Sequence, residues 1–208
     1  LSGVLNTHLM LAFMLRTHGT DEQKGRYLPA MVRGEHRGAL CLTEPHAGSD
    51  AAAIRTRAER VGPADAPEVY RLTGTKVWIS NAPEADRYLV FATLDPSAGA
   101  SAITAFLVEK GTPGFRFGTH EKKMGIRGSS TVELRLDHVR VPKENVLGEV
   151  DKGFGVALGL LDGGRIGIAS QALGMAQACL DASIRYAKER EQFGQPIGSF
   201  QSTPTLPA

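Results

Sequence analysis

Hydrophobic residues recur with two different periods along this chain. Residues 1–37 carry apolar side chains at helical spacing. Thr20-Asp21-Glu22-Gln23 is a capping-box signature, so a second helix is expected to begin there. The positions at helical spacing in the first part are Leu5, Leu9, Ala12, Phe13 and Arg16. The chain is therefore predicted to open with a helical segment.

Residues 38–150 change to the two-residue period of half-buried strands. Gly, Pro, Asn and Asp separate these runs at spacings typical of an antiparallel sandwich or barrel. No helical pattern interrupts them. The predicted strands cover 54–60, 69–73, 76–80, 88–94, 103–108, 115–117 and 132–136.

From Gly153 the helical period returns for about forty residues. Six glycines lie between 153 and 167, and each costs about 1 kcal/mol relative to Ala inside a helix. Close approach of another backbone or of a ligand would compensate, and a helix break near Gly163-Gly164 is the alternative. The apolar stripe comprises Phe154, Ala157, Leu161, Ile168, Ala172, Leu173, Ala176, Leu180, Ile184 and Ala187.

These periods predict an α+β fold in three parts: a helical segment over 1–37, an antiparallel β domain over 38–150, and a long helix over 151–208 that opens a second helical domain. Both ends of the chain suggest part of a larger protein. Leu1 to Leu15 already lie within a helical pattern that has neither a cap nor an initiator Met, and residues 202–208 dissolve into Pro and Thr.

Composition narrows the function. The 24 basic and 22 acidic residues are interspersed, so nothing argues for a nucleic-acid partner or an anionic membrane. Cys41 and Cys179 lie far apart in apolar patterns, which indicates reduced packing residues and no metal site. No apolar run is long enough to cross a bilayer, so no membrane insertion is expected.

The first candidate binding segment is Leu40 to Asp50, a short apolar run that Pro45 and Gly48 interrupt. Such a loop can wrap around a ligand, and a β-turn between two strands is the alternative. Trp78 and Ser80 are predicted to share one strand face. An indole beside a hydroxyl suits a planar heteroaromatic ligand, whereas a lone Trp is more often part of a core.

Two later segments add polar groups. Asp162 and Arg165 could pair across one helical turn or hold the polar groups of a nucleotide. Residues 190–197, followed by Gln201, end the long helix in a tight turn that combines Arg, Phe and Gln. The loop at 124–130 is polar and bears glycines, and by itself it indicates only a turn.

Taken together, the motifs resemble the acyl-CoA dehydrogenase family. The matching segments occur in the family's order and cover nearly the whole chain up to Gln201. The family's fold is a helical domain, a β domain and a second helical domain, in the order predicted above. The segments are TEPHAGSD (43–50), KVWISNA (76–82), KKMGIRGSS (122–130), LDGGRIGIASQALGMAQ (161–177) and REQFGQPIGSFQ (190–201).

The resemblance implies FAD as cofactor. Thr43 would lie at the pyrimidine end of the flavin, Trp78 over the ring and Ser80 near N5, with Arg190 and Gln201 reaching the FAD of a neighbouring subunit. The implied cofactor-binding residues are Leu40, Cys41, Leu42, Thr43, Gly48, Ser49, Trp78, Ile79, Ser80, Arg190 and Gln201. The implied substrate-binding residues are Ser49, Ser129, Asp162, Gly163, Gly164 and Arg165.

The resemblance also implies the reaction: α,β-dehydrogenation of an acyl-CoA thioester to the enoyl-CoA, with electrons passing to an electron-transferring flavoprotein. It implies a homodimer or homotetramer, in the cytoplasm or the mitochondrial matrix. Gly164 stands where some branches carry the catalytic Glu, so the base is expected beyond Gln201 and this chain lacks it. Two alternatives stay open: an acyl-CoA oxidase or flavin monooxygenase of the same fold, and a non-catalytic FAD- and CoA-binding fragment.

Overall fold

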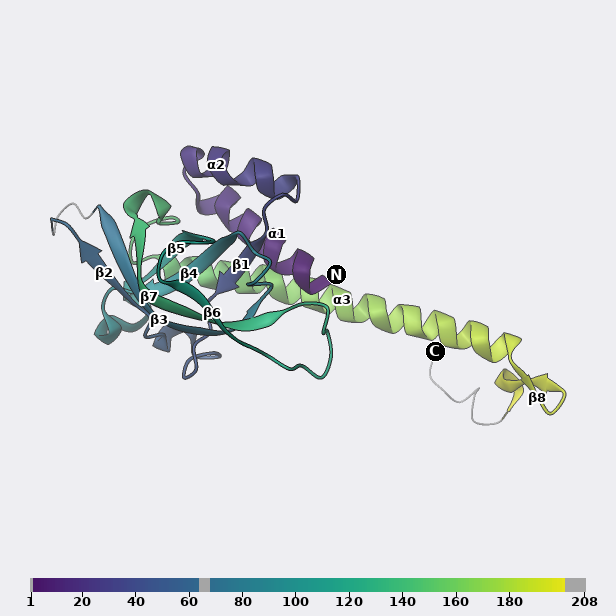
Figure 1. Ribbon diagram of the computed structural model, residues 1–208. Coiled ribbons are helices and arrows are strands. Elements are labelled where there is room, and N and C mark those ends of the chain that lie inside the picture. Colours follow the sequence, from purple (N-terminus) through teal and green to yellow (C-terminus); the bar gives the residue numbers. More distant parts are fainter. Residues whose placement is uncertain (1, 64–67, 201–208) are drawn as a thin grey trace. The chain divides into compact units, whose positions relative to one another are not determined.

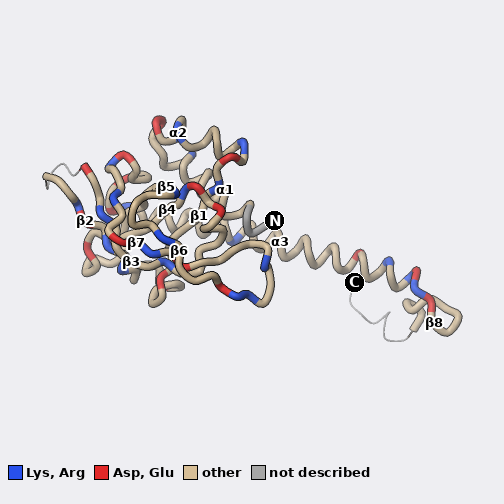
Figure 2. The backbone as a smooth tube through the Cα atoms, in the orientation of Figure 1, with Lys and Arg blue, Asp and Glu red and all other residues tan. Residues whose placement is uncertain are grey.

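The computed structural model describes residues 2–63 and 68–200 (Figure 1). The chain divides into two compact units, Leu1–Gly164 and Arg165–Ala208, and each is described by itself. The first unit holds two helices, a seven-stranded sheet and the start of a third helix. Figure 2 shows basic and acidic residues intermixed along the backbone of this unit, as the sequence indicates.

The first two helices are α1 (Ser2–His18) and α2 (Asp21–Val32). The predicted capping box opens α2: the Thr20 hydroxyl accepts from the Gln23 amide at 3.1 Å, and the Gln23 side chain accepts from the Thr20 amide at 3.1 Å. The Gln23 side chain also donates to the carbonyls of Glu144 and Val146. This cap therefore fixes both the start of α2 and its contact with the chain that follows the sheet.

The helical spacing at the N-terminus did not identify the buried face of α1. Leu5, Leu9 and Phe13 are exposed by 48%, 60% and 54%, whereas the buried positions are Leu11, Met14 and Leu15. Because α1 is apolar on most sides, its period allowed more than one buried face. Contact with β1 decides the matter, since a Cβ at Gly38 would lie 2.8 Å from the Leu11 side chain.

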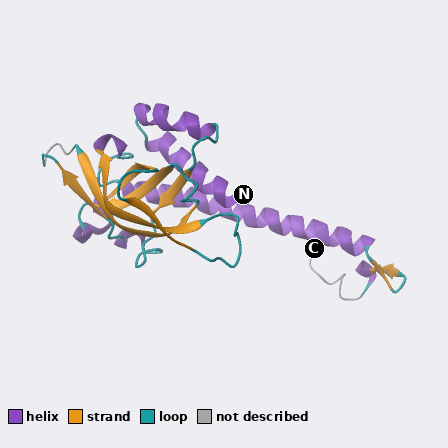
Figure 3. Cartoon of the chain, in the orientation of Figure 1, coloured by secondary structure: helices purple, strands orange, loops and turns teal. Residues whose placement is uncertain are grey.

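The predicted β region forms one curled sheet (Figure 3). Its order is β1-β4-β2-β3-β7-β6, with β5 paired to β4. Most neighbours are antiparallel, but β1 pairs with β4 in parallel, and β2 joins β4 through one parallel bridge. The strands are β1 (Gly38–Cys41), β2 (Arg57–Val61), β3 (Val69–Ser80), β4 (Arg87–Thr93), β5 (Ile103–Glu109), β6 (Phe115–His120) and β7 (Thr131–Pro142).

Strands β4 and β5 are buried on both faces, which explains their continuous apolar sequence. Tyr88 and Val90 on β4 enter the core inside the curl of the sheet, and Leu89 and Phe91 enter the core between the sheet and the helices. The second core is completed by α1, α2 and the first turns of α3 (Gly153–Glu189). The helices thus cover one face of the sheet around its most buried strands.

Helix α3 begins against β5. A Cβ on Gly153 would lie 2.6 Å from the backbone nitrogen of Ala105, so the predicted close approach of another backbone is confirmed there. A Cβ on Gly155, Gly159 or Gly163 would meet nothing within 4 Å. The helix is nonetheless continuous through Gly163 and Gly164, and the alternative of a break is not observed.

The second unit contains the rest of α3 followed by a short hairpin of β8 (Glu191–Gln192) and β9 (Gln195–Pro196). Phe193 and Gly194 form its two-residue turn at φ 53° and 75°, as a type I′ turn requires. The tight turn predicted after the helix is therefore present. Within this unit the apolar stripe is exposed, as shown by Ile168, Leu173 and Ile184. Of the helices described, none is long and apolar enough to cross a membrane.

Candidate functional site

Two segments that the sequence singled out lie against each other: the loop at 42–50, after β1, and the end of β3. The backbone amide of Val77 donates to the carbonyl of Thr43 at 2.9 Å. The Lys76 ammonium donates to the carbonyl of Leu42 at 3.1 Å. More than thirty residues of chain separate the partners, so the fold brings these predicted binding segments together.

A β-bulge near the end of β3 shapes this site. Lys76 pairs with Leu134 and Ile79 with Val132, so Val77 and Trp78 together oppose a single residue of β7. Trp78 has φ 58°, a region that costs a residue other than Gly about 1–3 kcal/mol. Such strain commonly marks a functional site. The bulge therefore holds an aromatic side chain in a costly backbone conformation.

The Trp78 side chain is available to a ligand, because it is 64% exposed. Ile79 is only 2% exposed and Ser80 is half-buried. The shared face of Trp78 and Ser80 stays a prediction, because the bulge interrupts the alternation of the strand. Within the described part of the chain, the hydroxyls of Thr43, Ser49 and Ser80 make no hydrogen bond to protein. An exposed indole and three unpaired hydroxyls can together bind a ligand that has a planar ring with polar edges and a phosphate chain.

Two of the other predicted cofactor residues, Cys41 and Ile79, can contribute only their backbone, because their side chains are buried. Cys41 is fully buried, and burial raises the pKa of its thiol to about 12, so the thiol is neutral and unreactive at pH 7. Ile79 is also buried. Leu40 and Leu42 are half-buried, and Gly48 is exposed in the loop. Gly48 needs no special conformation, since a Cβ there would lie at an ordinary 3.6 Å from Thr43.

A buried ion pair lies beneath the loop. The Lys76 ammonium donates to Glu44 Oε1 at 2.7 Å, and the side chains are 0% and 2% exposed. The Glu44 carboxylate also accepts the backbone amides of Arg55 at 2.7 Å and Thr56 at 3.0 Å. His46 Nε2 lies 3.6 Å from Glu44 Oε2. This pair was not predicted from the sequence; the signal available was a Lys directly before the apolar run at 77–79.

The Lys76–Glu44 pair predicts how the free energy of unfolding depends on pH. Burial by itself raises the pKa of the Glu44 carboxyl, but the Lys76 charge and the hydrogen bonds from Lys76, Thr56 and Arg55 outweigh it and hold the pKa below its ordinary 4.5. The stability that Glu44 contributes is therefore complete above pH 4.5 and is lost as pH falls through the lower folded pKa. Urea unfolding of wild type and Glu44→Gln from pH 7 to 3 should show their difference shrinking only below pH 4.5. A difference that stays constant to pH 3 contradicts this prediction.

The position of Ser129 differs from that of an exposed ligand-binding residue. It is 5% exposed, and its hydroxyl donates to Asn81 Oδ1 at 2.9 Å. The Asn81 side chain donates in turn to the Thr7 hydroxyl at 2.7 Å, and the Asn81 amide to the carbonyl of Ser130 at 2.9 Å. Asn81 has φ 60° and was not singled out by the sequence. Ser129 thus joins the end of β3 to the loop before β7, and its predicted contact with substrate stays a prediction.

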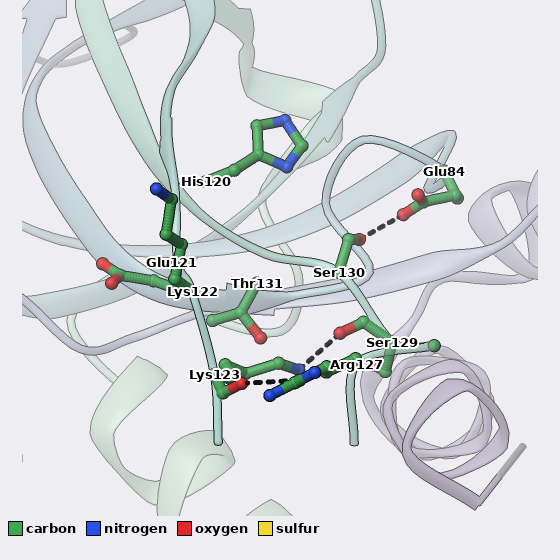
Figure 4. A pocket seen from close by; sticks show the side chains of 10 residues that line it. Glu84, His120, Glu121, Lys122, Lys123, Arg127, Ser129, Ser130 and Thr131 are labelled. Carbon is green, nitrogen blue, oxygen red and sulfur yellow. Dashed lines mark hydrogen bonds between the residues drawn. The ribbon is translucent and has the colours of Figure 1, made fainter. Parts of the chain in front are cut away.

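A hollow of about 540 Å³ lies beside Ser129 (Figure 4). In Figure 4, Ser130 faces Glu84, and Lys123 and Arg127 lie beside each other away from His120. Thr131, in its wall, pairs with Ser80 across β3 and β7, so the hollow adjoins the strand that carries Trp78. Its lining residues are Glu84, His120, Glu121, Lys122, Lys123, Arg127, Gly128, Ser129, Ser130 and Thr131.

The remaining predicted residues lie on α3 or after it. Asp162 and Gly163 are exposed, and a Cβ on Gly164 would lie 3.1 Å from the Met10 methyl group. Arg165 and Arg190 belong to the second unit, where the Arg190 amide donates to the carbonyl of Tyr186. Gln201 lies outside the described residues. The parts of these residues in a binding site stay predictions.

The fold and this site define a protein with a mainly antiparallel β domain between helical segments. Two family models match the chain: the acyl-CoA dehydrogenase middle domain over residues 39–139 and the acyl-CoA dehydrogenase C-terminal domain over 151–205. The chain belongs to the acyl-CoA dehydrogenase family.

Individual relatives agree with this assignment. The short/branched chain specific acyl-CoA dehydrogenase of Rattus norvegicus is 50% identical over 188 residues, 90% of this chain and 42% of the rat protein. Butyryl-CoA dehydrogenase of Megasphaera elsdenii superimposes with a TM-score of 0.91 at 46% identity, over 98% of this chain and 53% of that one. An acyl-CoA dehydrogenase of Bacillus anthracis complexed with FAD gives a TM-score of 0.85 at 38% identity, over 95% and 33%. This chain spans about half the length of the curated relatives it matches.

Proposed function

We propose that this chain forms the FAD-binding and acyl-CoA-binding part of an acyl-CoA dehydrogenase. The observation that carries the proposal is the exposed Trp78, held on a strained bulge against a loop that offers unpaired hydroxyls. Trp78 would cover one face of the flavin and keep water from it, as Thr43 and Ser80 hydrogen-bond polar edges of the ring. Ser49, exposed in the same loop, would bind the pyrophosphate.

The reaction proposed is α,β-dehydrogenation of an acyl-CoA. Bound FAD would supply the two-electron acceptor for the hydride from the β-carbon. The base that takes the α-proton is proposed to lie beyond Gln201, because Gly164 offers no carboxylate. Further proposals follow the family: electrons pass to an electron-transferring flavoprotein, the enzyme is a homodimer or homotetramer, and it works in the cytoplasm or the mitochondrial matrix. The three-part division at 37/38 and 150/151 is likewise a proposal.

We place the phosphates of CoA in the hollow beside Ser129. Three cationic side chains line it against two carboxylates, and its wall continues from the strand of Ser80. One of the carboxylates, Glu84, already accepts a hydrogen bond from Ser130. Cationic groups beside a strand end suit an anionic nucleotide more than they suit a neutral pantetheine arm.

The placement predicts a charge effect. Lys122→Glu/Arg127→Glu is expected to weaken binding of CoA about tenfold, or 1.4 kcal/mol, because two attractive charges become repulsive. Calorimetric titration with CoA measures this, and pantetheine, which lacks the nucleotide, should bind both proteins alike. Lys143→Glu, at an exposed position directly after β7, is the control. An unchanged CoA affinity in the double variant would place the nucleotide elsewhere.

Trp78 is the only tryptophan in the chain, so its emission reports on the proposed site directly. Adding FAD to the 208-residue chain is expected to quench that emission with saturation, and the saturable quenching should vanish in urea. Thr43→Ala and Ser49→Ala should raise the half-saturating FAD concentration. Emission that stays unchanged by FAD, in a chain that purifies colourless, would overturn the cofactor proposal.

An anaerobic titration of the FAD-loaded chain with butyryl-CoA tests the reaction. A yellow protein whose visible flavin band does not bleach supports the placement of the base beyond Gln201. Bleaching shows that a base lies within the chain and overturns that placement. Steady oxygen consumption with acyl-CoA and no added acceptor would instead favour an oxidase of the same fold.

A further inference from the structure

We propose that Lys76 is a positioning residue, which sets the flavin-binding loop against the Trp78 bulge through its two contacts at Leu42 and Glu44. The inference rests on the proposed function for its ligand. Lys76 cannot touch a flavin, because its side chain is completely buried. Its effect must therefore pass through the groups that its ammonium holds.

Those groups lie at the root of the loop. One ammonium hydrogen is donated to the carbonyl of Leu42 and another to the carboxylate of Glu44. The next residue along β3, Val77, donates its amide to the carbonyl of Thr43. Residues 76 and 77 thus hold three consecutive loop residues, and Trp78 follows immediately. A shift of the ammonium would displace the loop relative to the indole.

Glu44 fixes the far side of the same loop. Its carboxylate accepts the amides of Arg55 and Thr56, just before β2. Its own backbone exchanges hydrogen bonds with Ala47, at 2.8 Å and 3.2 Å, which close the turn directly before the exposed Gly48 and Ser49. The ion pair therefore connects β3, the turn and the start of β2 at one point.

Stability alone does not account for this pair. Glu44 and Lys76 are the two charged residues among the buried ones in the described part of the chain. A protein in which two apolar side chains of similar volume replace a buried ion pair is often as stable as the original, because burying the two charges costs their hydration. What an apolar pair cannot do is hold the Leu42 carbonyl and two backbone amides in place. The geometry thus points to loop placement as the role of the pair.

The test compares wild type with Lys76→Met/Glu44→Met, which replaces the pair by apolar side chains. The double variant is expected to keep the fold, to bind FAD at least tenfold more weakly by Trp78 quenching, and to exchange the Val77 amide hydrogen at least tenfold faster without FAD. The Val90 amide, within β4, should change by less than twofold. Lys24→Met, at a partly exposed residue of α2 that pairs with the fully exposed Asp21, should match wild type in all three measurements.

Unchanged FAD affinity and unchanged Val77 exchange in a folded double variant overturn the inference. If the double variant does not fold, Glu44→Asp replaces it, because the shorter carboxylate keeps the charge but not the reach, and the same two changes are expected. A wild-type chain that does not bind FAD overturns the proposed function, and Val77 exchange then decides by itself whether Lys76 places the loop. If the double variant exchanges the Val77 amide hydrogen fast but binds FAD with wild-type affinity, the Lys76–Glu44 pair is a structural contact without a role in FAD binding.

Discussion

Replacing Lys76 with Met is expected to lower the free energy of unfolding by about 3–5 kcal/mol, a large share of the stability of a typical domain. The substitution leaves the Glu44 carboxylate buried without its counter-charge and removes a donor from the Leu42 carbonyl. Urea unfolding at pH 7, followed by circular dichroism, measures the loss. An intact slope with a lowered midpoint would show that stability, and not the extent of unfolding, has changed.

The matched control is Lys24→Met. Lys24 also forms an ion pair, with Asp21 at 3.5 Å, but Asp21 is fully exposed. Exposed pairs contribute about 0–1 kcal/mol, so this variant should unfold almost as wild type does. Lys76→Met/Glu44→Met should recover much of the loss, because no charge is then left buried. If Lys76→Met costs less than 1 kcal/mol, the pair is not shielded from water as the structure indicates.

The second large effect is expected at Gly153, where α3 meets β5. A methyl group there would lie 2.6 Å from the backbone nitrogen of Ala105 and 2.8 Å from the Cα of Thr104. These backbone atoms belong to β5, which is buried on both faces, so they cannot move aside as a flexible side chain can. Gly153→Ala is therefore expected to cost about 1–3 kcal/mol, the range for overpacking, as measured by thermal and urea unfolding.

Gly155 and Gly159 supply the controls in the same helix. A Cβ at either position meets nothing within 4 Å. Gly→Ala there should raise the free energy of unfolding by up to about 1 kcal/mol, because Ala is the better helix former. Opposite signs at 153 and at 155 or 159 would separate close packing from helix propensity. A stabilised Gly153→Ala would show that α3 does not approach β5 as closely as described.

The sequence by itself determined the order of the elements and the residues that offer chemistry. The change of hydrophobic period placed the sheet between helices, and the Thr20–Gln23 capping box fixed the start of α2. Both signals are local, because they depend on residues within a few positions of one another. The TEPHAGSD and KVWISNA segments resemble those of the acyl-CoA dehydrogenase family. The family models and the relatives support the assignment of this chain to that family.

Only the tertiary structure decided how these pieces meet. The buried face of α1 depends on its contact with β1, and the parallel pairing of β1 with β4 joins strands that the chain separates by more than forty residues. The Trp78 bulge needs β7 as its partner, and the Lys76–Glu44 pair forms because the loop and β3 exclude water together. Desolvation is a property of the assembled surroundings, so a short sequence window cannot show which charges will be buried.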